Sequence, residues 1–499
     1  MTGTKKLFMT AAVLIILLFL SEAVLRATNA VPPERPLRDS FVKRGPLFIK
    51  GGTYYRTAPG KNLYMPEFFP VKKGGSTVRI FIAGGSSAMG FPLQGVYGPH
   101  ELLERALMTI YPGRNFEIIN AAGFARASYH VADVVAEVAG YEADAVVVMA
   151  GHNEFLERRF PTLSGDNAVD RALSRSRTYV FIKGLVLYLS GDFEADVWKP
   201  HVVGDMERRV VMADFRENLI AIKGSCKKAG VPLVLVDCPS NIKDYRPFGP
   251  SPIPRETMEA VDREISQLGF ARAKAMLDGL SEKYPDDAWL KFEYGWALWT
   301  ESQLSTAGLT SMEELMEGKG RENELVNKAV LYWRKAKDND GWPVRALTSA
   351  NDIIEEEALE GAALARFKEK LEAGAVPDGA PGDNAFFDHC HPGVDSQKTL
   401  AISIIAALDE AGAVQGLPFG WEEMAKKSWE RLADEVPPEA WSASYRRMAI
   451  EVGINMDRPR RGLIYADRAI EFAPDNPELV SLKTRLVKRA AEKGPLTGD

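Results

Sequence analysis

The sequence predicts an α/β protein whose core is a parallel β-sheet covered by helices on both faces. Four short apolar runs, rich in β-branched residues, recur within residues 77–253, and helical stretches separate them. Near-continuous apolar strands that alternate with helices are typical of parallel sheets buried on both faces. Glycine-rich or polar segments follow three of these runs, so they are expected to share the edge formed by the carboxyl ends of the strands.

The elements of this core follow one another regularly. Each strand prediction rests on an apolar run and each helix prediction on helical spacing of apolar residues. The expected order is strand 78–83, helix 100–110, strand 116–121, helix 131–139, strand 144–150, helix 215–228 and strand 232–237. From about Pro254 we expect no further strands, and a long helical block runs to about Phe367.

A chain of 499 residues with 46% hydrophobic residues exceeds what one core usually organises, so two or three globular domains are expected. The predicted divisions are an N-terminal membrane anchor or signal segment (1–30), a Pro/Gly-rich lead-in (31–76), the first part of the sheet domain (77–253), an inserted helical domain (254–373), the last part of the sheet domain (374–415) and a C-terminal helical region (416–499).

Charge and cysteine content exclude some classes of protein. The net charge is -6, the isoelectric point is near 5.8, and no dense basic run occurs, so the chain lacks the field that draws proteins onto nucleic acid. Three cysteines are too few for a disulfide framework and do not define a redox compartment.

The N-terminus predicts a membrane anchor. Lys5 and Lys6 precede an apolar run that extends from Leu7 to Leu20 and resumes to Leu25, about 28 Å as a helix. Glu22 and Arg26 lie where a signal peptidase prefers small residues. We therefore expect an uncleaved anchor with the bulk of the chain extracytoplasmic; a secreted chain after signal cleavage is the alternative. Basic residues that follow the run oppose this orientation, namely Arg26, Arg35, Arg38, Lys43 and Arg44.

Three segments resemble tetratricopeptide repeats. Residues 269–299 combine small and aromatic residues at helical spacing with a Tyr-Pro-Asp-Asp break, and similar patterns recur at 327–340 and 462–477. The resemblance implies helical hairpins that bind a protein partner. Generic hairpins whose alanines and aromatic residues only pack together are the alternative.

Two segments that are distant in the sequence carry residue types that suit hydrolysis by a serine nucleophile. Ser86 lies in GGSSAMG directly after the first predicted strand, and Asp388 and His391 stand three residues apart before Pro392. A nucleophilic serine needs an imidazole to take its proton and a carboxylate to orient that imidazole. NAAGFA, with Gly123, and GHNEF, with Asn153, follow the next two strands.

These four blocks, in this order, resemble the SGNH or GDSL-type hydrolase superfamily. The resemblance covers roughly residues 77–250 and 380–412 and implies a three-layer, flavodoxin-like parallel sheet. It implies Ser86 as nucleophile, His391 as base and Asp388 as orienting acid. Oxyanion donors would be Ser86, Gly123 and Asn153. The family's usual aspartates are replaced by Gly85 before the nucleophile and by Glu154 after Asn153.

Other residues and ligands are alternatives for the same segments. Ser87 is an alternative nucleophile, and His389 an alternative base that more readily packs or lines the cleft. Nucleotide binding is disfavoured because no Lys follows the glycine-rich turn and G-x-G-x-x-G is absent. Zinc is disfavoured because consecutive ligands cannot surround one ion. We expect no metal and no other cofactor. Arg345 and Asn351 are candidate substrate-binding residues, with surface solvation or helix capping as the alternative.

The sequence therefore predicts a serine esterase that cleaves a carboxylic, for example O-acetyl, ester of a small molecule, lipid or polysaccharide. Two alternatives remain open at this point. One is an O-acyltransferase that modifies an envelope polysaccharide through the same site. The other is a non-catalytic scaffold in which the repeat-like helices recruit a protein.

Overall fold

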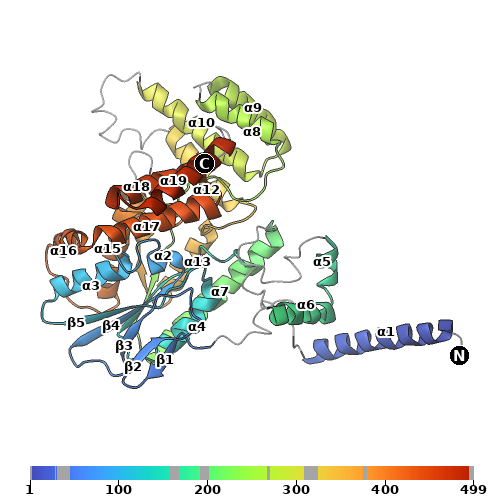
Figure 1. Cartoon of the computed structure of the whole chain (residues 1–499), viewed down its shortest axis with the longest axis horizontal. Helices are drawn as coiled ribbons and strands as arrows, with labels where there is room; N and C mark the ends of the chain where they lie inside the picture. The colour runs from blue at the N-terminus through green and yellow to red at the C-terminus, as the bar shows by residue number, and fades with distance from the viewer. Residues whose placement is uncertain are drawn as a thin grey trace. The chain divides into compact units, whose positions relative to one another are not determined.

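The computed structural model of the 499-residue chain describes residues 3–28, 30, 45–157, 168–190, 202–266, 270–307, 324–374 and 379–493 (Figure 1). The chain forms two compact units. The smaller comprises Met1–Gly45 with Glu154–Asp214, and the larger comprises Pro46–Asn153 with Phe215–Asp499.

A five-stranded, fully parallel sheet forms the centre of the larger unit. Its strand order is β5-β4-β6-β7-β8, which is the 2-1-3-4-5 order of flavodoxin-like doubly wound folds. The four strands predicted from apolar runs are confirmed. The strands are β4 (Thr77–Gly84), β5 (Asn115–Asn120), β6 (Ala145–Met149), β7 (Leu233–Val236) and β8 (Ala363–Ala365).

The prediction that strands stop at Pro254 is wrong. β8 lies inside the segment that we expected to be wholly helical, and its Leu364 pairs with Leu235 of β7. Its three residues, Ala-Leu-Ala, favour helix by propensity and are too few to show a period. The sheet domain therefore resumes well before residue 374, the boundary expected from the sequence.

Helices cover both faces of the sheet, which gives three layers (Figure 1). Right-handed crossovers put α4, α7 and α13 on one face and α3 and α15 on the other. Lys223 of α7 forms an ion pair with Glu357 of α13, and Asn218 of α7 donates to Ser128 of α4 at 3.0 Å. The bounds are α3 (Pro99–Ile110), α4 (Ser128–Val138), α7 (Asp205–Ala229), α13 (Thr348–Leu359) and α15 (Val394–Glu410).

The lead-in segment contains strands that its sequence did not predict. β1 (Phe48–Gly51), β2 (Tyr54–Thr57) and β3 (Phe68–Pro70) form a small antiparallel sheet. Phe48 and Phe69 are buried against Phe81 of β4. Strands of three or four residues are too short to reveal a period of two, which explains the difference. Residues 31–44 lie outside the described part of the chain.

Helices make up the first part of the expected insertion. They pack around two apolar clusters, one centred on Trp333 and the other on Leu277 and Leu290. Their helical character agrees with the prediction, and the tetratricopeptide resemblance stays a prediction. The helices are α8 (Arg255–Ser266), α9 (Phe270–Lys283), α10 (Ala288–Ala307) and α12 (Glu324–Asp338), with α14 (Phe367–Gly374) following β8.

The C-terminal helices pack directly on the sheet domain. Trp429, fully buried, donates from its indole to the carbonyl of Leu102 in α3 at 2.7 Å, and Tyr97 donates to the carbonyl of Trp429 at 3.0 Å. Arg447 donates to the carbonyl of Pro92 at 2.6 Å. The elements are α16 (Trp421–Glu435), α17 (Pro438–Ile450), the π-helical turn η4 (Glu451–Asn455), α18 (Pro459–Phe472) and α19 (Pro477–Lys493).

The smaller unit consists of helices in its described part. They are α1 (Gly3–Thr28), α5 (Ala168–Leu173), α6 (Arg177–Ser190) and the first residues of α7. Among the described residues, one helix is long and apolar enough to cross a membrane, over Met9–Thr28; a signal sequence would pass the same test.

Candidate active site

The candidate site lies beyond the carboxyl ends of the parallel strands. Ser86 opens the single-turn helix α2 (Ser86–Met89) directly after β4, and Asn153 follows β6. Asp388 and His391 belong to the connection between α14 and α15. The turn after β4 requires glycine at position 84, because φ is +156° there and a Cβ would lie 2.2 Å from the carbonyl oxygen of Met149.

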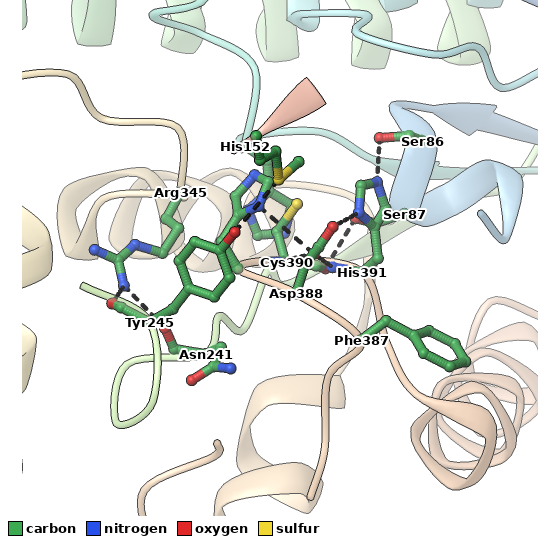
Figure 2. A network of polar contacts seen from close by, with 12 residues as sticks. Ser86, Ser87, His152, Asn241, Tyr245, Arg345, Phe387, Asp388, Cys390 and His391 are labelled. Carbon is green, nitrogen blue, oxygen red and sulfur yellow. Dashed lines mark hydrogen bonds and ion pairs between the residues drawn. The ribbon is translucent and has the colours of Figure 1, made fainter. Parts of the chain in front are cut away.

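Ser86, His391 and Asp388 form a continuous chain of hydrogen bonds (Figure 2). Ser86 Oγ lies 2.8 Å from His391 Nε2, although the two residues are 305 positions apart. His391 Nδ1 lies 2.6 Å from Asp388 Oδ2. All three side chains are buried, and Ser86 is only 6% exposed.

The environment of Asp388 keeps its carboxylate ionised. Burial alone would raise its pKa, but the charges of His391 and His389 and the hydrogen bonds from His391 and the Cys390 N–H hold the pKa well below its usual range. Asp388 Oδ1 accepts the N–H groups of Cys390 and His391, each at 2.9 Å. An ionised carboxylate at Nδ1 requires a proton on that nitrogen, so Nε2 accepts the hydroxyl proton of Ser86.

The two alternative residues have other partners. Ser87 Oγ donates to the carbonyl of Cys390 at 3.0 Å and so fastens the turn after β4 to the Asp388–His391 segment. The ring of His389 packs against both Tyr245 and Phe248, with centroid separations of 5.5 and 5.2 Å. His389 Nδ1 lies 3.6 Å from Asp388 Oδ1, beyond hydrogen-bond length.

Of the three expected oxyanion donors, Gly123 is already engaged. Its N–H donates to the carbonyl of Gly84 at 3.0 Å. Asn153 Nδ2 donates to the carbonyl of Arg126 at 3.0 Å, and its second N–H makes no hydrogen bond to a residue that the structure describes. The N–H of Ser86 opens α2 and has no partner within that helix.

Ala125 is a candidate donor that the sequence did not indicate. It has φ of +56°, in the left-handed region that alanine rarely adopts, and within the described part of the chain its N–H makes no hydrogen bond. The next residue, Arg126, presents its carbonyl to Asn153. A Cβ on Gly85 would come within 3.4 Å of that same carbonyl oxygen, so this turn lies beside Gly85 and Ser86. An alanine in an apparently ordinary loop gives no sequence signal for such a conformation.

Contact with Asn153 explains why residue 85 is glycine here and not the aspartate expected from the resemblance. A Cβ at Gly85 would lie 2.5 Å from Asn153 Nδ2. Any side chain there would displace the amide, so glycine at 85 and asparagine at 153 depend on each other.

Arg345 and Asn351 do not reach the candidate site as free substrate-binding groups. Arg345 is 2% exposed and donates to the carbonyls of Asn241 and Tyr245 at 2.9 and 2.6 Å (Figure 2). The Asn351 side chain accepts the N–H of Cys238 and donates to the carbonyl of Cys238, just after the end of β7. Both residues hold the loops after β7 in place.

Residues from the C-terminal helices also surround the site. Tyr465 of α18 donates to the carbonyl of Phe387, next to Asp388. Half-buried Glu451 opens the π-helical turn η4, and its pKa is raised, mainly by burial, with opposing contributions from His391 and Asp388. Phe91 packs on the His391 ring at 4.9 Å. Nothing in the sequence spacing of Glu451 and Tyr465 predicted that they would lie near the Asp388–His391 segment.

Asp388, His389 and Cys390 are close enough to suggest a metal site, with one ligand atom from each within 4.8 Å of the others. Their chemistry does not fit one. Both Asp388 oxygens already accept N–H groups. Burial and the neighbouring Asp388 charge raise the pKa of the Cys390 thiol far above its ordinary value, so the thiolate that a metal requires is disfavoured.

A prediction about acid stability follows from His152, which is 5% exposed and accepts the N–H of Ala346 at 3.1 Å. Burial, followed by the charges of His389 and His391, lowers its pKa from 6.5 to about 3. Between these pH values the unfolded chain binds a proton that the folded chain does not, so stability falls with falling pH. The unfolding free energy of the wild type should fall as the pH is lowered from 7 to 5. In His152→Asn this fall should be smaller by about 2 kcal/mol, as measured by urea denaturation at the two pH values.

His100 offers a control of opposite sign. Burial lowers its pKa, but the carboxylates around it, Glu101 foremost, outweigh burial and raise the pKa overall. Its contribution is therefore present below the unfolded pKa and is lost as pH rises. His100→Asn should cost more stability at pH 5 than at pH 8. Parallel pH profiles for wild type and His152→Asn would contradict the assignment of His152.

Comparison with known proteins gives only distant structural likenesses. No protein-family model matches the chain, and no curated protein matches it either. Among solved structures, TesA covers 67% of this chain and 99% of its own, with 11% identity and a TM-score of 0.27. A GDSL-like lipase from Bacteroides thetaiotaomicron has 10% identity, a TM-score of 0.28 and coverages of 67% and 88%. An α/β hydrolase from the metagenome of Lake Arreo, Spain, has 12% identity, a TM-score of 0.29 and coverages of 69% and 99%. At these TM-scores the likenesses carry no argument about this chain.

Proposed function

We propose that this protein is a serine ester hydrolase in which Ser86 attacks the carbonyl carbon of a carboxylic ester. The observation that carries the proposal is the hydrogen-bonded order Ser86 Oγ, His391 Nε2, His391 Nδ1 and Asp388 Oδ2, with separations of 2.8 and 2.6 Å. A buried, correctly ordered acid, imidazole and hydroxyl is the arrangement that serine catalysis requires.

In the proposed mechanism His391 takes the proton of Ser86 as Oγ bonds to the carbonyl carbon. Asp388 stabilises the resulting imidazolium, and the same proton then passes to the departing alcohol. Water, deprotonated by His391, resolves the acyl-enzyme and releases the acid. The Ser86 hydroxyl is regenerated in that step.

Three N–H groups are proposed to bind the oxyanion, and they differ from the sequence-based set. Ser86 N–H and the second amide hydrogen of Asn153 are retained. The N–H of Ala125 replaces that of Gly123, because Gly123 already donates to Gly84 while the Ala125 N–H is unused among the described contacts. Donors fixed before the reaction stabilise developing charge without reorganising.

The acyl-enzyme provides the direct test. The full-length chain in detergent is mixed with a short-chain nitrophenyl ester, quenched in acid during the steady state and digested. We expect the acyl mass on the peptide that contains Ser86. Acylation of a different residue, or turnover with no acylated peptide under conditions that trap a control serine esterase, would refute the mechanism.

Asn153→Ala should lower kcat by about 10²- to 10³-fold with little change in KM, because it removes one donor that acts mainly in the transition state. The matched control is Asn218→Ala, which removes an amide bonded to Ser128 on the helices that cover the sheet. Near-normal kcat in Asn153→Ala would exclude this amide from oxyanion binding.

Acyl transfer to a hydroxyl other than water is the second candidate. Its support is the burial of Ser86 and His391 at 6% and 3% exposure, since restricted water access favours a bound acceptor over hydrolysis. Product analysis with an added sugar acceptor separates the two, because transfer yields the acylated sugar and hydrolysis yields the free acid.

In the same proposal α1 anchors the protein in a membrane with the site on the extracytoplasmic side, and the substrate is an ester-bearing lipid, small molecule or polysaccharide. The anchor is supported by the apolar Met9–Thr28 helix. Protease protection of the C-terminus in sealed vesicles tests the orientation.

A further inference from the structure

The smaller unit exposes an unusual number of large apolar side chains outside α1. Monomeric soluble domains seldom leave contiguous apolar patches uncovered. Phe181, Leu185 and Leu189 of α6 are 37%, 38% and 74% exposed. Among the described residues of this unit outside α1, the exposed large apolar side chains are Val169, Leu173, Phe181, Ile182, Leu185, Val186, Leu189, Val202 and Met206.

Five of these side chains form a stripe along α6. Phe181, Ile182, Leu185, Val186 and Leu189 follow the spacing i, i+1, i+4, i+5 and i+8. At 100° per residue they occupy about 140° of the helix circumference. Val180 and Gly184 are buried on another side of the helix. α6 therefore packs inward through one face and presents a separate apolar face outward.

α1 is fastened to the beginning of α6 by polar contacts. The Glu22 carboxylate accepts the N–H groups of Arg177 and Thr178 at 3.1 and 2.9 Å. It also accepts the Ser176 hydroxyl at 2.8 Å, and Ser21 Oγ lies 3.0 Å from Thr178 Oγ1. A carboxylate at these N–H groups caps the helix and complements its dipole. This explains an acidic residue inside an otherwise apolar run.

The position of Glu22 along α1 sets the depth of α6. Glu22 lies six residues before Thr28, the end of the apolar span, which corresponds to about 9 Å of helix. Helices that lie in a membrane interface bury their apolar face by about 5–10 Å. If α1 spans the bilayer, the cap therefore holds the start of α6 at interfacial depth.

Basic side chains gather at the same junction. Arg26 of α1 donates to the carbonyl of Arg175 at 3.2 Å and forms an ion pair with Glu22 at 2.6 Å, and its side chain is 57% exposed. Arg177 is the first residue of α6, and Arg175 lies two residues before it. A cluster of arginines beside an apolar helical face suits anionic lipid headgroups.

We propose that α6 is a second membrane-binding element, an interfacial helix that inserts its Phe181–Leu189 stripe among the acyl chains beside α1. α1 is then a retained part of the folded protein, because cleavage after it would remove the cap of α6. The bound lipid surface contains anionic phospholipid, which the junction arginines contact. This inference rests on the membrane anchor proposed for α1 and not on the proposed esterase activity.

Fluorescence quenching in proteoliposomes tests the inference on the full-length chain. Val186→Cys and Leu189→Cys are labelled with an environment-sensitive NBD fluorophore; the three native cysteines are buried. The matched control is Val487→Cys on α19 of the larger unit, 50% exposed. Vesicles contain phosphatidylcholine with or without phosphatidylglycerol.

We expect labels at 186 and 189 to be quenched by nitroxide-bearing acyl chains at least several-fold more than the label at 487, and more so with phosphatidylglycerol. Aqueous iodide should quench 487 preferentially. Equal quenching at all three positions would overturn the inference. Protection of 186 and 189 from both quenchers, growing with protein density, would also overturn it and would indicate a second copy of this chain as the occupant.

The cap is tested separately by hydrogen exchange in the same vesicles. Glu22→Ala should speed exchange of the Arg177 and Thr178 amides by roughly tenfold, since removing a helix cap costs about 1 kcal/mol or somewhat more. Unchanged exchange at these amides would show that Glu22 does not hold α6, and with it the argument for depth would fail.

Discussion

Ser86→Ala should lower kcat/KM for ester hydrolysis by about 10⁴- to 10⁶-fold. The variant loses the hydroxyl that lies 2.8 Å from His391 Nε2, and with it the covalent step. The backbone N–H of residue 86 remains, as do the amide of Asn153 and the histidine. A residual acceleration from oxyanion binding is therefore expected, rather than the uncatalysed rate.

Ser87→Ala is the matched control, because it changes the same atom type at the next position. Its hydroxyl bonds to the carbonyl of Cys390, so we expect a loss of stability and a smaller change in kcat. The activities of the two full-length variants are measured by nitrophenyl ester hydrolysis in detergent. If Ser86→Ala retained wild-type activity, or if Ser87→Ala alone abolished it while remaining folded, Ser86 would not be the nucleophile.

The sheet core was predictable because its strands are long enough to display a pattern. β4, β5 and β6 are five residues or longer and contain short apolar, β-branched stretches, and each prediction falls within one or two residues of the observed element. A regular βα alternation then fixes parallel pairing and brings strand ends together. This is why Ser86 and Asn153 were expected near one another without any distance information.

The pairing of Ser86 with His391 was predicted from residue chemistry together with the resemblance of the four sequence blocks, whereas the surroundings of the pair were not predicted. Short elements such as β8 carry no period, and their pairing is decided by contacts made only in the folded chain. The left-handed conformation of Ala125 depends on tertiary contacts, not on its own propensity.

The C-terminal helices help to position the candidate site. From the sequence they were a separate repeat-like region, but they contact the loop that carries Asp388 and His391. Arg461 forms an ion pair with Asp383 at 2.5 Å, and Arg458 lies over the Tyr245 ring at 4.0 Å. Tyr245 in turn packs on His389. The position of the imidazole therefore depends on helices distant in sequence, and variants there are expected to affect activity through the Asp388–His391 loop.

Asp388→Asn should lower kcat by about 10⁴-fold while leaving the fold largely intact. In the wild type, ionised Asp388 requires the proton of His391 on Nδ1, which leaves Nε2 free to accept the hydroxyl proton of Ser86. An asparagine that turns its NH₂ group toward Nδ1 reverses these roles, because Nδ1 must then accept and Nε2 carries the proton. Such an imidazole donates to Ser86 and cannot act as its base.

The measurement separates this effect from simple destabilisation. Asp388 Oδ1 accepts two backbone N–H groups at 2.9 Å, and an asparagine carbonyl oxygen can replace it there, so unfolding by urea should shift little compared with the loss in kcat. Asp395→Asn, an exposed aspartate in the first turn of α15, is the control and should keep near-normal kcat. A tenth or more of wild-type kcat in a folded Asp388→Asn variant would mean that the carboxylate does not set the tautomer of His391, because an uncharged amide would then serve equally well at 2.6 Å from Nδ1.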